Sequence, residues 1–594
     1  MNKLLRPLWV LLLPLCLNAQ QKTGFTAKEK KALFEHHPQN WHLLSFETEG
    51  VYGTGVNKTY SELLKGKQAK KVIVAVIDAG VDITHEDLKS VIWTNTKEIP
   101  GNGIDDDHNG YVDDVHGWNF LGSADGKTNI EFATSEDDRE YVRLSRIYEH
   151  RDTTKLNAAD LKYFNLVKRK SALAQAKRNT ELVTKMAANI DSIDRYLRKV
   201  YPNKVITIQA LYDTKPEFAE DKQMILLYEL LKMRAQGNKY SNDLPVNITY
   251  KLGPFMVSNS INNYQQQLVT SSKDGRAVVM AGLKPGQNWG NNQLSFKNSD
   301  HGTHVAGIIG ADRTNTIGVE GIADHVEIMP IRVVVPQGDE YDEDVAKAIR
   351  YAVDNGAQLI NMSFGKRLSP HKELVDEAIR YAEKKDVLIV RGAGNFTDNT
   401  DQYVFYPSQF YNNGKRAENV ITVGATSPFG EIMGFSNFGK NSVDLFAPGF
   451  DLYSTMVGGK YSGMHGTSVA SPVVCGIAAL IRSYYPKLSA PEVKNILMQT
   501  VTKVPEEWQD KQKLQNISIS GGIVNAYEAL KLAGELSKQT NNQDEEDIIY
   551  RILTICTIWL CPTATHRRTD QICIEPFWTK FKKTQHQEHF RCFR

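Results

Sequence analysis

The sequence predicts an α/β protein in three layers, with a mostly parallel central sheet, helices on both faces of the sheet, and an inserted, mainly helical subdomain. Three observations support this fold class. Residues 72–78 form an unbroken run rich in Val and Ile, as in a strand that is buried on both faces. From residue 326 onwards, strand-like and helix-like stretches alternate. Between these regions, residues 182–200 repeat apolar side chains at helical spacing.

The chain has 594 residues, which is more than one ordinary domain. Its 71 basic and 69 acidic residues nearly balance to a net charge of +2, so we expect no nucleic-acid partner. In the main body the only cysteine is Cys475, which lies in an apolar run and is expected to be buried. The main body must therefore be stabilised by core burial and not by disulfides.

The first 19 residues have the three regions of a secretory signal peptide: Lys3 and Arg6, an apolar run at 8–17, and a cleavage site after Ala19. We therefore expect an exported protein, either secreted or periplasmic. A lipoprotein is less consistent with the sequence, because Cys16 does not follow a small residue. The apolar run is too short to span a bilayer, and we expect no transmembrane segment beyond the signal peptide.

Changes in composition divide the rest of the chain. The expected parts are an extended N-terminal arm (20–40), the first part of the α/β domain (41–123), the inserted helical subdomain (124–290), the second part of the α/β domain (291–540) and a tail (541–594). In the insertion, a second helix should begin after Thr214, and the insertion either packs on the parent domain or binds an unknown partner. The tail contains Cys556, Cys561, Cys573 and Cys592 and matches no zinc pattern. It is a disulfide-linked appendage, a disordered extension or the product of a shifted reading frame.

The second part of the α/β domain should alternate between strands and helices. The expected strands are 326–335, 358–362, 387–391 and 419–423, and the expected helices are 342–355, 371–385, one that begins near Ser468 and one that begins after Ser489. Ser489 and Glu492 have the spacing of a capping box. A final helix should follow residues 521–526 and close the domain.

Four polar residues stand where chemistry is expected. Asp78 ends the buried strand, at the edge where open α/β sheets bind ligands. Ser468 begins a helix, where unpaired N–H groups would stabilise an oxyanion, although a capping serine occurs at the same position. His301 and His304 open another helix and could hold a metal, but no third ligand at helical spacing completes such a site.

Residues 101–114 carry oxygen side chains at alternate positions ahead of a glycine, as in the first nine positions of a calcium loop. The candidate ligands are Asp105, Asp107, Asn109 and Asp113. The twelfth position is His116 and not the expected Glu, so the loop is not a complete EF-hand. A calcium loop and an Asx-rich turn both remain open.

Four stretches in chain order resemble the subtilisin-like serine proteases. They are Asp78-Ala79-Gly80-Val81, His85-Glu86-Asp87-Leu88, the His-Gly-Thr-His-Val-Ala-Gly of 301–307 and the Gly-Thr-Ser-Val-Ala-Ser-Pro of 466–472. The resemblance implies that Ser468 is the nucleophile, His301 the general base and then acid, and Asp78 the carboxylate that orients the imidazole. Asn395, in a stretch similar to the family's Ala-Ala-Gly-Asn, would donate to the oxyanion. His304 is then not catalytic.

The resemblance also implies how a peptide would bind. An extended substrate would pair with Ser363, Phe364 and Gly365, and Gly392, Ala393 and Gly394 would form one wall of the pocket for the residue before the scissile bond. Phe405 stands at the pocket floor, where many relatives have a small residue, so we expect a preference for small or medium side chains. The acidic residues Asp339, Glu340, Asp342 and Glu343 suggest a preference for basic residues further upstream.

One calcium site carries over from the resemblance. Its ligands would be Asp87, Asn315, Ile317 and Val319, with an ordinary turn as the alternative. We expect structural calcium and no organic cofactor.

The sequence therefore predicts an exported serine endopeptidase that acts on peptides or proteins through an acyl-enzyme. Two alternatives remain open: a peptide cyclase or transpeptidase on the same fold, and a non-catalytic binding protein that presents the insertion. The chain departs from the family pattern in the long separation of Asp78 and His301, which the insertion fills, and in the short segment ahead of Trp41, where a propeptide is usual.

Overall fold

The structure is a computed structural model of the chain. It describes residues 25–148, 155–202, 253–272, 275–280, 283, 288–335, 337–509 and 512–539. The expected signal peptide, the helix expected after Thr214 and the four cysteines of the tail lie outside these residues. The chain divides into two compact units, Met1–Gly534 and Glu535–Arg594, and the features below belong to the first unit.

The core of the first unit is a seven-stranded sheet with the strand order β2-β3-β1-β4-β5-β6-β7. The strands are β1 (Val72–Asp78), β2 (Trp118–Asn119), β3 (Val326–Arg332), β4 (Leu359–Met362), β5 (Leu388–Gly392), β6 (Val420–Thr426) and β7 (Leu445–Pro448). Every neighbouring pair is parallel. The carboxyl ends of the strands therefore meet at one edge, where ligands bind in sheets of this kind.

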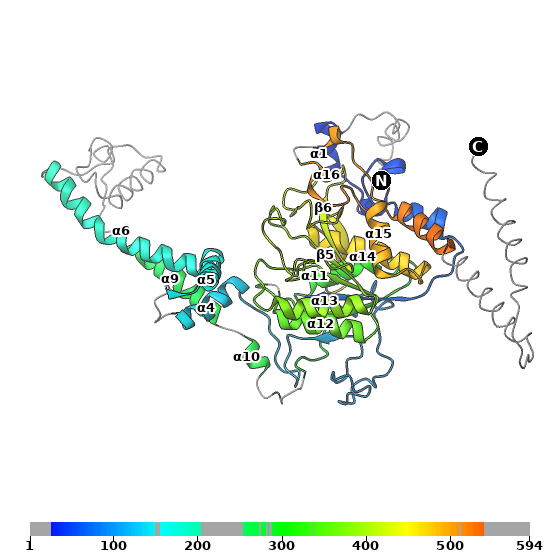
Figure 1. The fold of residues 1–594 in the computed structure, drawn as a ribbon, viewed down its shortest axis with the longest axis horizontal. Helices are drawn as coiled ribbons and strands as arrows, with labels where there is room; N and C mark the ends of the chain where they lie inside the picture. The colour runs from blue at the N-terminus through cyan, green and yellow to red at the C-terminus, as the bar shows by residue number, and fades with distance from the viewer. Residues whose placement is uncertain are drawn as a thin grey trace, which may run out of the picture. The chain divides into compact units, whose positions relative to one another are not determined.

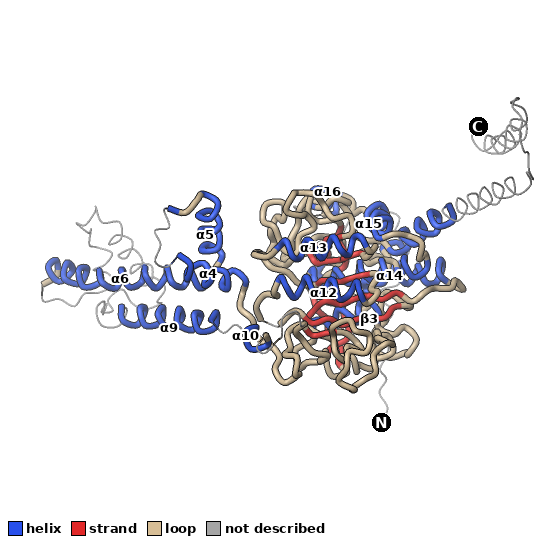
Figure 2. Tube along the Cα trace, turned by 60° about the horizontal axis from the view of Figure 1, so that its bottom comes forward, coloured by secondary structure: helices blue, strands red, loops and turns tan. Residues whose placement is uncertain are grey.

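Helices cover both faces of the sheet (Figures 1 and 2). One pair is α12 (Asp342–Asp354) with α13 (Lys372–Lys384), and the other is α11 (Asp300–Gly310) with α14 (Thr467–Tyr484). The side chains of α12 and α13 join one apolar cluster with sheet residues such as Ile77 and Ile360. In the described residues α14 alone is long and apolar enough to cross a membrane, but 89% of it is buried inside the protein, as in a core helix. The three-layer α/β prediction is confirmed.

Most predicted elements of the second part agree with the structure within three residues at each end. The last predicted capping box also forms, because Ser489 N donates to Glu492 Oε2 over 2.7 Å at the start of α15 (Ala490–Gln499). Residues 526–534 are helical, as expected for the end of the domain. The sequence reading missed β2, β7 and an antiparallel hairpin of β8 (Leu452–Met456) and β9 (Lys460–Met464).

The sequence predicts an extended N-terminal arm, but the structure shows the helix α1 (Ala27–Glu35) there. Thr26 and Glu29 form a capping box at its start. Phe34 from this helix packs edge-on against Phe429 and Phe450, with ring centroids 5.0 and 4.7 Å away. The capping box and these ring contacts hold a helix in the arm, although Phe34 itself remains 39% exposed. Other short α-helices of the α/β domain in the described residues are α2 (Phe46–Glu49), α3 (Val56–Lys58) and α16 (Leu514–Ile517).

The insertion is helical wherever it forms regular structure in the described residues. Its helices are α4 (Glu136–Tyr148), α5 (Ala158–Lys170), α6 (Ala172–Val200), α9 (Gly253–Ser272) and α10 (Arg276–Val279). The helix predicted at 182–200 is confirmed as part of α6, which packs along α9 (Figure 2). The apolar stripe is not buried at its two ends, however, since Leu182 and Val200 are 44% and 43% exposed.

Candidate active site

Asp78 and His301 meet at the carboxyl edge of the sheet. Asp78 is the last residue of β1 and is 1% exposed, and its Oδ1 lies 2.7 Å from His301 Nδ1 at the start of α11. Because a carboxylate can only accept, Nδ1 carries the hydrogen and Nε2 is the nitrogen left free to take a proton. Gly302 permits this approach, since a Cβ there would lie 3.2 Å from Asp78 Cβ and 2.1 Å from Gly80 O.

The charge of Asp78 raises the pKa of the His301 imidazole. Burial acts to lower the pKa of His301, but the attraction of the Asp78 carboxylate and its hydrogen bond outweigh burial, so the pKa is raised above its ordinary value of 6.5. Asp78 Oδ2 is buried and accepts no hydrogen bond within the described part of the chain. Oδ1 accepts from both His301 Nδ1 and Ala79 N over 2.7 Å, and the negative charge of the carboxylate favours the protonated imidazole.

Ser468 is the second residue of α14 and is half-buried. In the described residues its backbone N–H donates no hydrogen bond, as expected in the first turn of a helix. The helix begins after Gly466, whose φ of 148° favours glycine. A Cβ at Gly466 would lie 3.0 Å from Ser468 Oγ and 3.1 Å from Asn395 Nδ2, so these two groups converge on one point.

Asn395 follows β5 by three residues, and Thr467 fixes the orientation of its amide. The amide oxygen Oδ1 accepts from Thr467 N over 2.9 Å and from Thr467 Oγ1 over 3.0 Å. Thr467 Oγ1 in turn accepts from Gly394 N over 3.0 Å. The NH₂ group of Asn395 is thereby turned towards the approach to Ser468, as an oxyanion donor must be. Sequence reasoning missed this function of Thr467, although Thr467 stands beside Ser468 in the motif.

The structure thus pairs Asp78 with His301, and separately places Ser468 beside Asn395. The α11 and α14 helices, which carry His301 and Ser468, pack against each other. Among the described residues, the His301 side chain has a hydrogen bond to Asp78 and none to Ser468. At the carboxyl edge of the sheet the structure has an imidazole with a raised pKa, the Ser468 hydroxyl, and two N–H donors, Ser468 N and Asn395 Nδ2. These are the kinds of group that acyl transfer requires.

The segment Ser363–Gly365 continues from β4 towards this edge. The backbone N–H groups of Phe364 and Gly365 donate no hydrogen bond within the described part of the chain, so they are available to an incoming strand. Ser363 Oγ donates to Ser468 O over 2.7 Å, so the side chain of Ser363 supports the helix that carries the hydroxyl. Phe364 packs its ring against the hydrophobic core.

The ring of Phe405 lies between two predicted parts of the binding pocket. A Cβ at Gly365 would lie 2.5 Å from Phe405 Cε1, and a Cβ at Gly394 would lie 2.9 Å from the same atom. The ring therefore fills space that the glycines leave open. Beneath it the guanidinium of Arg391 is buried, and burial lowers its pKa to about 10.

Two further predicted residues are structural. His304 is buried, and its Nε2 lies 2.9 Å from Leu452 O and 3.1 Å from Ser462 O, which ties α11 to the β8–β9 hairpin. Burial lowers the pKa of His304 to about 4, so the ring is neutral at pH 7. Cys475 is a free, buried cysteine in α14, and burial raises the pKa of its thiol. Neither residue contacts Ser468 through a hydrogen bond in the described chain.

The four residues of the predicted Asp87 site lie together but are satisfied without a metal. Asp87 Oδ1 accepts from Asn315 Nδ2 over 2.7 Å, and Oδ2 accepts from Val319 N over 2.8 Å. Asn315 Oδ1 accepts from Ile317 N over 3.0 Å. Asn315 therefore presents a donor to the carboxylate, where a calcium ligand would present an oxygen, and this geometry fits a closed turn better than a cation site.

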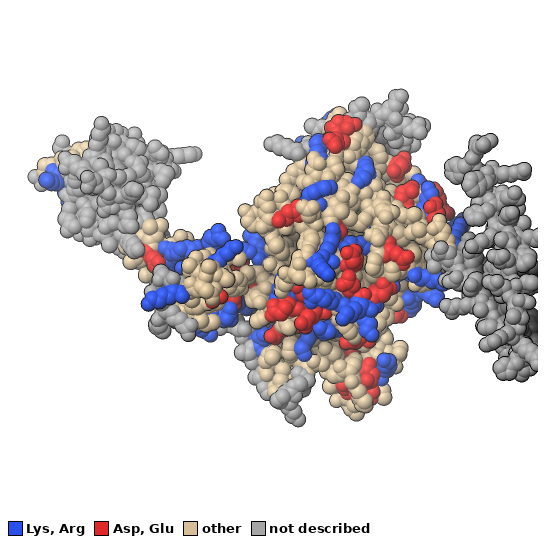
Figure 3. All heavy atoms as spheres, in the orientation of Figure 1, with Lys and Arg blue, Asp and Glu red and all other residues tan. Residues whose placement is uncertain are grey.

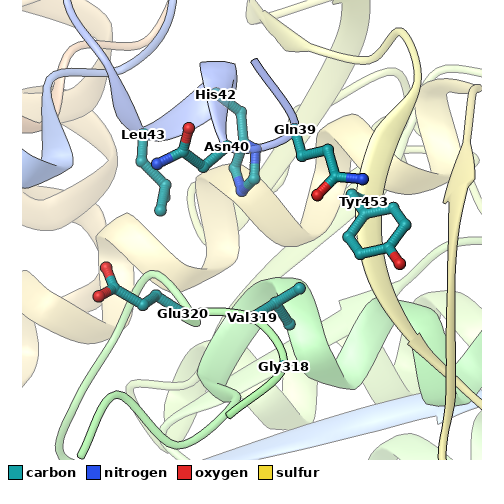
Figure 4. A pocket seen from close by; sticks show the side chains of 8 residues that line it. All are labelled: Gln39, Asn40, His42, Leu43, Gly318, Val319, Glu320 and Tyr453. Atoms are coloured by element: carbon teal, nitrogen blue, oxygen red, sulfur yellow. The ribbon is translucent and has the colours of Figure 1, made fainter. Parts of the chain in front are cut away.

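This turn also forms one wall of a pocket of about 410 Å³ (Figure 4). Its lining comprises Gln39, Asn40, His42, Leu43, Gly318, Val319, Glu320 and Tyr453. In Figure 4 the side chains of Gln39 and Tyr453 lie side by side at one end of the pocket, and Glu320 lies at the other. His42 is buried, and burial lowers its pKa to about 3, so it is neutral.

In the Asx-rich loop, two of the four predicted ligands come together with a residue that sequence reasoning missed. Asp105, Asp107 and Glu98 each place a carboxylate oxygen within 4.8 Å of the others. Asp113 does not join them, because its oxygens accept from the N–H groups of residues 101–103 over 2.8 to 3.2 Å. Asn109 accepts from Tyr111 N through Oδ1 over 2.8 Å. In the structure, Asp113 therefore makes turn contacts and is not part of the carboxylate group.

The first helix of the insertion, α4, is attached to Lys366, just beyond the segment Ser363–Gly365. Lys366, directly after Gly365, is buried, and its Nζ lies 2.6 Å from Glu136 Oε2 and 2.9 Å from Asp342 Oδ1. Arg139 contacts the same Glu136 oxygen over 2.7 Å and donates to Glu340 O over 3.1 Å. No sequence pattern indicated this contact between the insertion and the α/β domain.

The acidic residues expected to favour basic substrates are largely compensated by the protein itself. Asp342 pairs with Lys366, Glu343 pairs with Arg276 over 2.8 Å, and Asp339 Oδ2 accepts from Glu136 N over 2.7 Å. Glu340 is buried, and burial raises its pKa to about 7. The prediction of a preference for basic residues is therefore not supported by the geometry. Over the described surface in Figure 3, acidic and basic side chains are interspersed.

Comparison with known proteins agrees with this geometry. Residues 198–519 match a family model described as the Subtilase family. The match begins inside the insertion and does not include β1. The family match therefore says nothing about Asp78, and only its contact with His301 places Asp78 at the site.

Individual relatives are similar over shorter stretches. The chain is 38% identical over 206 residues to a thermophilic serine proteinase of Bacillus sp. (strain AK1), covering 35% of this chain and 48% of the relative. It is 36% identical over 220 residues to subtilisin DY of Bacillus licheniformis, covering 36% of this chain and 76% of the relative. The chain thus matches about half the length of the first relative and three quarters of the second.

Solved structures are similar over a comparable share. A prenylagaramide maturation protease is 26% identical with a TM-score of 0.33, covering 39% of this chain and 82% of that chain. A protease from Pseudoalteromonas arctica is 26% identical with a TM-score of 0.35, covering 42% and 80%. The fold assignment rests on the sheet topology and not on these superpositions.

Proposed function

Because the chain belongs to the subtilase family, we propose that it is an exported serine endopeptidase that hydrolyses peptide bonds through an acyl-enzyme intermediate. The observation that carries the proposal is the convergence of Ser468 Oγ and Asn395 Nδ2 on one point, at the edge of the sheet where Asp78 holds His301. Export is inferred from the signal-like residues 1–19.

In the proposed reaction, His301 Nε2 takes the proton of Ser468 as Oγ bonds to the substrate carbonyl carbon. The carbonyl oxygen becomes an oxyanion and accepts hydrogen bonds from Asn395 Nδ2 and the Ser468 N–H. The C–N bond then breaks, and His301 gives its proton to the leaving amine. Water enters by the same steps and releases the acid. The hydrogen bond from Ser468 to His301 forms when substrate orders the site, since such bonds often tighten only in the complex.

The proposed substrate is an extended peptide that pairs with Ser363–Gly365 through main-chain hydrogen bonds. Pairing of this kind does not select a sequence. Selection at the residue before the scissile bond comes from the pocket bounded by residues 392–394, where the ring of Phe405 leaves room for a small or medium side chain. A substrate with a large aromatic residue at this position would have to displace that ring.

Structural calcium is part of the proposal, but not at both predicted loops. The Asp87 turn has both of its carboxylate oxygens satisfied by protein donors. The loop of Asp105 and Asp107 gathers three carboxylates, which are the hard oxygen ligands that calcium prefers, and Asp105 also accepts from Asn109 N and Gly110 N.

The proposal is tested by mass analysis of products from a mixture of extended peptides, with Ser468→Ala as the control. We expect the parent protein to give pairs of fragments whose masses sum to the peptide plus one water, and the variant to give none. Ligated or cyclic products without water uptake would identify a transpeptidase instead. Binding of peptides without any product from the parent protein would contradict an enzymatic function.

A further inference from the structure

Arg391, the fourth residue of β5, carries a buried charge that the proposed reaction does not use. The residue is 4% exposed, and burial lowers its pKa to about 10, so the guanidinium stays positive at pH 7. In the part of the chain that the structure describes, it forms no ion pair with an Asp or Glu. The nearby carboxylate of Asp444 pairs with Arg416 instead, and burial raises the pKa of Glu340 to about 7. The positive charge of Arg391 therefore lacks a counter-ion.

Two of the three guanidinium nitrogens of Arg391 also lack an acceptor. Nη1 donates to Phe405 O over 3.3 Å, whereas Nε and Nη2 are buried and have no hydrogen-bond partner in the described chain. Nε and Nη2 lie along one edge of the planar group, and this edge can donate two parallel hydrogen bonds to the two oxygens of a carboxylate. A buried donor without an acceptor is costly, because it has lost water and gained no partner. The unmet donors thus match a carboxylate.

A small cavity of about 30 Å³ lies beside the guanidinium. Thr400, Ser408, Thr422 and Ser442 contribute hydroxyl groups to its lining. The cavity has room for about one water. A single water would satisfy a donor but would leave the positive charge without a counter-ion.

The ring of Phe405 stands between this buried charge and the proposed substrate pocket. A Cβ on Gly365 or on Gly394, two glycines of the pocket, would lie 2.5 or 2.9 Å from Phe405 Cε1. The guanidinium carbon of Arg391 lies 5.4 Å from the centre of the same ring, within the range of a cation–π contact. Phe405 also lines the small cavity, and neither glycine does. Displacement of one aromatic ring would therefore connect the pocket with the guanidinium.

The main chain beside Phe405 is fixed, so the ring can open the path only by rotation of its own side chain. Lys366 N donates to Tyr406 O over 2.9 Å, and Tyr406 N donates to Lys366 O over 2.8 Å. The ring of Phe396 lies 5.7 Å from that of Phe405 and is 49% exposed. It provides an apolar surface against which a rotated Phe405 ring would pack.

We propose that Arg391 makes the protein selective for peptides with an acidic residue, Glu or Asp, before the scissile bond. This inference rests on the proposed peptidase function and names its substrate class. The acidic side chain enters between Gly365 and Gly394 and turns the Phe405 ring aside, and its two oxygens accept from Nε and Nη2 of Arg391. A charge-assisted, two-bond contact then replaces the weaker contact of the cation with the ring. A neutral side chain of the same size has to turn the ring without this gain.

The test measures kcat/KM for three peptides that are identical except for Glu, Gln or Ala before one scissile bond. Glu and Gln have nearly the same shape, so their ratio reports the charge. The full-length parent is compared with Arg391→Met, which keeps the apolar bulk and removes a buried charge without a counter-ion, and with Arg367→Met. Arg367 is the matched control: its guanidinium carbon lies 4.2 Å from the centre of the Phe396 ring, but it is 41% exposed and pairs with Asp398.

We expect the parent to favour Glu over Gln by at least about ten-fold, because a neutral amide leaves the guanidinium without a counter-ion. The ratio should fall to about one in Arg391→Met and change by less than about two-fold in Arg367→Met, since an exposed ion pair contributes little. Equal cleavage of the Glu and Gln peptides by the parent, or the same ratio in Arg391→Met, would overturn the inference and leave the peptidase function intact.

Binding separates this inference from the proposed function. In the full chain carrying Ser468→Ala, calorimetry compares product peptides that end in Glu or in Gln at the residue that would enter the pocket. We expect the Glu peptide to bind at least about ten-fold more tightly, and this preference to be lost when Arg391→Met is added. If the parent cleaves no peptide but this preference holds, the peptidase function fails and the assignment of Arg391 stands. Equal binding of the two peptides would overturn the assignment.

Discussion

The proposed catalytic residues and the base of the insertion are attached to the same short segment, residues 363–366, by different forces. At one end, Ser363 Oγ donates a neutral hydrogen bond of 2.7 Å to Ser468 O. At the other end, the buried Lys366 ammonium pairs with Glu136 at 2.6 Å. The first contact positions a reacting group, and the second holds a helix of the insertion against the domain. Removal of the proposed oxyanion donor, Asn395, should therefore reduce the rate of catalysis, whereas removal of the buried Lys366 ammonium should reduce the free energy of unfolding.

The largest expected effect on stability comes from Lys366→Met. Removing Lys366 leaves the buried Asp342 carboxylate without its cationic partner and leaves Glu136 with Arg139 alone, so the free energy of unfolding should fall by about 3 to 5 kcal/mol. The matched control is Lys71→Met, because Lys71 is 67% exposed where it pairs with Glu327 and should cost less than about 1 kcal/mol. Denaturant unfolding in a Ser468→Ala background measures both. Equal losses in the two variants would show that the buried pair does not hold the insertion.

Asn395→Ala should have the complementary effect. Loss of the oxyanion donor should lower kcat by roughly 10² to 10³-fold with little change in KM, because the donor acts on charge that develops only in the transition state. Unfolding free energy should fall by no more than about 1 kcal/mol, the cost of losing one helix-capping acceptor. Asn413→Ala, in an exposed turn, serves as the control. A rise in KM with unchanged kcat would instead assign Asn395 to ground-state binding.

Phe405→Gly should alter selectivity at the pocket without altering the reacting groups. With the ring removed, kcat/KM for peptides with a large aromatic residue before the scissile bond should rise by about ten-fold or more relative to peptides with Ala there. Tyr403→Ala is the control, because Tyr403 is nearby in sequence and 62% exposed. If the parent protein already cleaves both peptides equally well, Phe405 does not limit the pocket.

The smallest expected effect is a shift in pH dependence. His301 must be neutral to act as a base, and its pKa is raised because the attraction of Asp78 outweighs burial. Activity should therefore fall as pH drops through a midpoint above 6.5 in the kcat/KM profile. Asp78→Asn removes the attraction, so in the residual activity the midpoint should move to lower pH. Asp300→Asn, beside His301 but without a hydrogen bond to the imidazole, should move it much less. A midpoint unaffected by Asp78→Asn would contradict the pairing.

Sequence reasoning identified the parallel sheet because its strands are long apolar runs that differ clearly from amphipathic helices. It missed β7, because Leu445–Pro448 is only four residues long, ends in Pro and is followed by Gly449, so it carries no usable period. It also missed the β8–β9 hairpin, although Gly458-Gly459 between the two strands is a recognisable hairpin signal. The helix α1 was missed because its stability comes from Phe34 packing on distant aromatic rings.

The residues of the candidate site also divide into those that a local sequence motif indicates and those that only the folded structure brings together. Asp78, His301, Asn395 and Ser468 were found because each lies in a local motif at the end of a strand or the start of a helix. Glu98 and the pair of Lys366 with Glu136 were not found, because each contact joins residues that no local pattern relates and that only folding brings together. The sequence left the role of Asp113 open, because an Asx-rich turn and a metal loop use the same residues.

The central claim is that Ser468 is a nucleophile activated by His301. The most direct measurement is covalent labelling by a serine-directed phosphonylating reagent, followed by mass mapping of the modified residue. The account predicts labelling at Ser468 in the parent protein, none in Ser468→Ala, and much slower labelling in a folded His301→Ala variant. Equal labelling of the parent and Ser468→Ala, or no labelling of the parent, would contradict it.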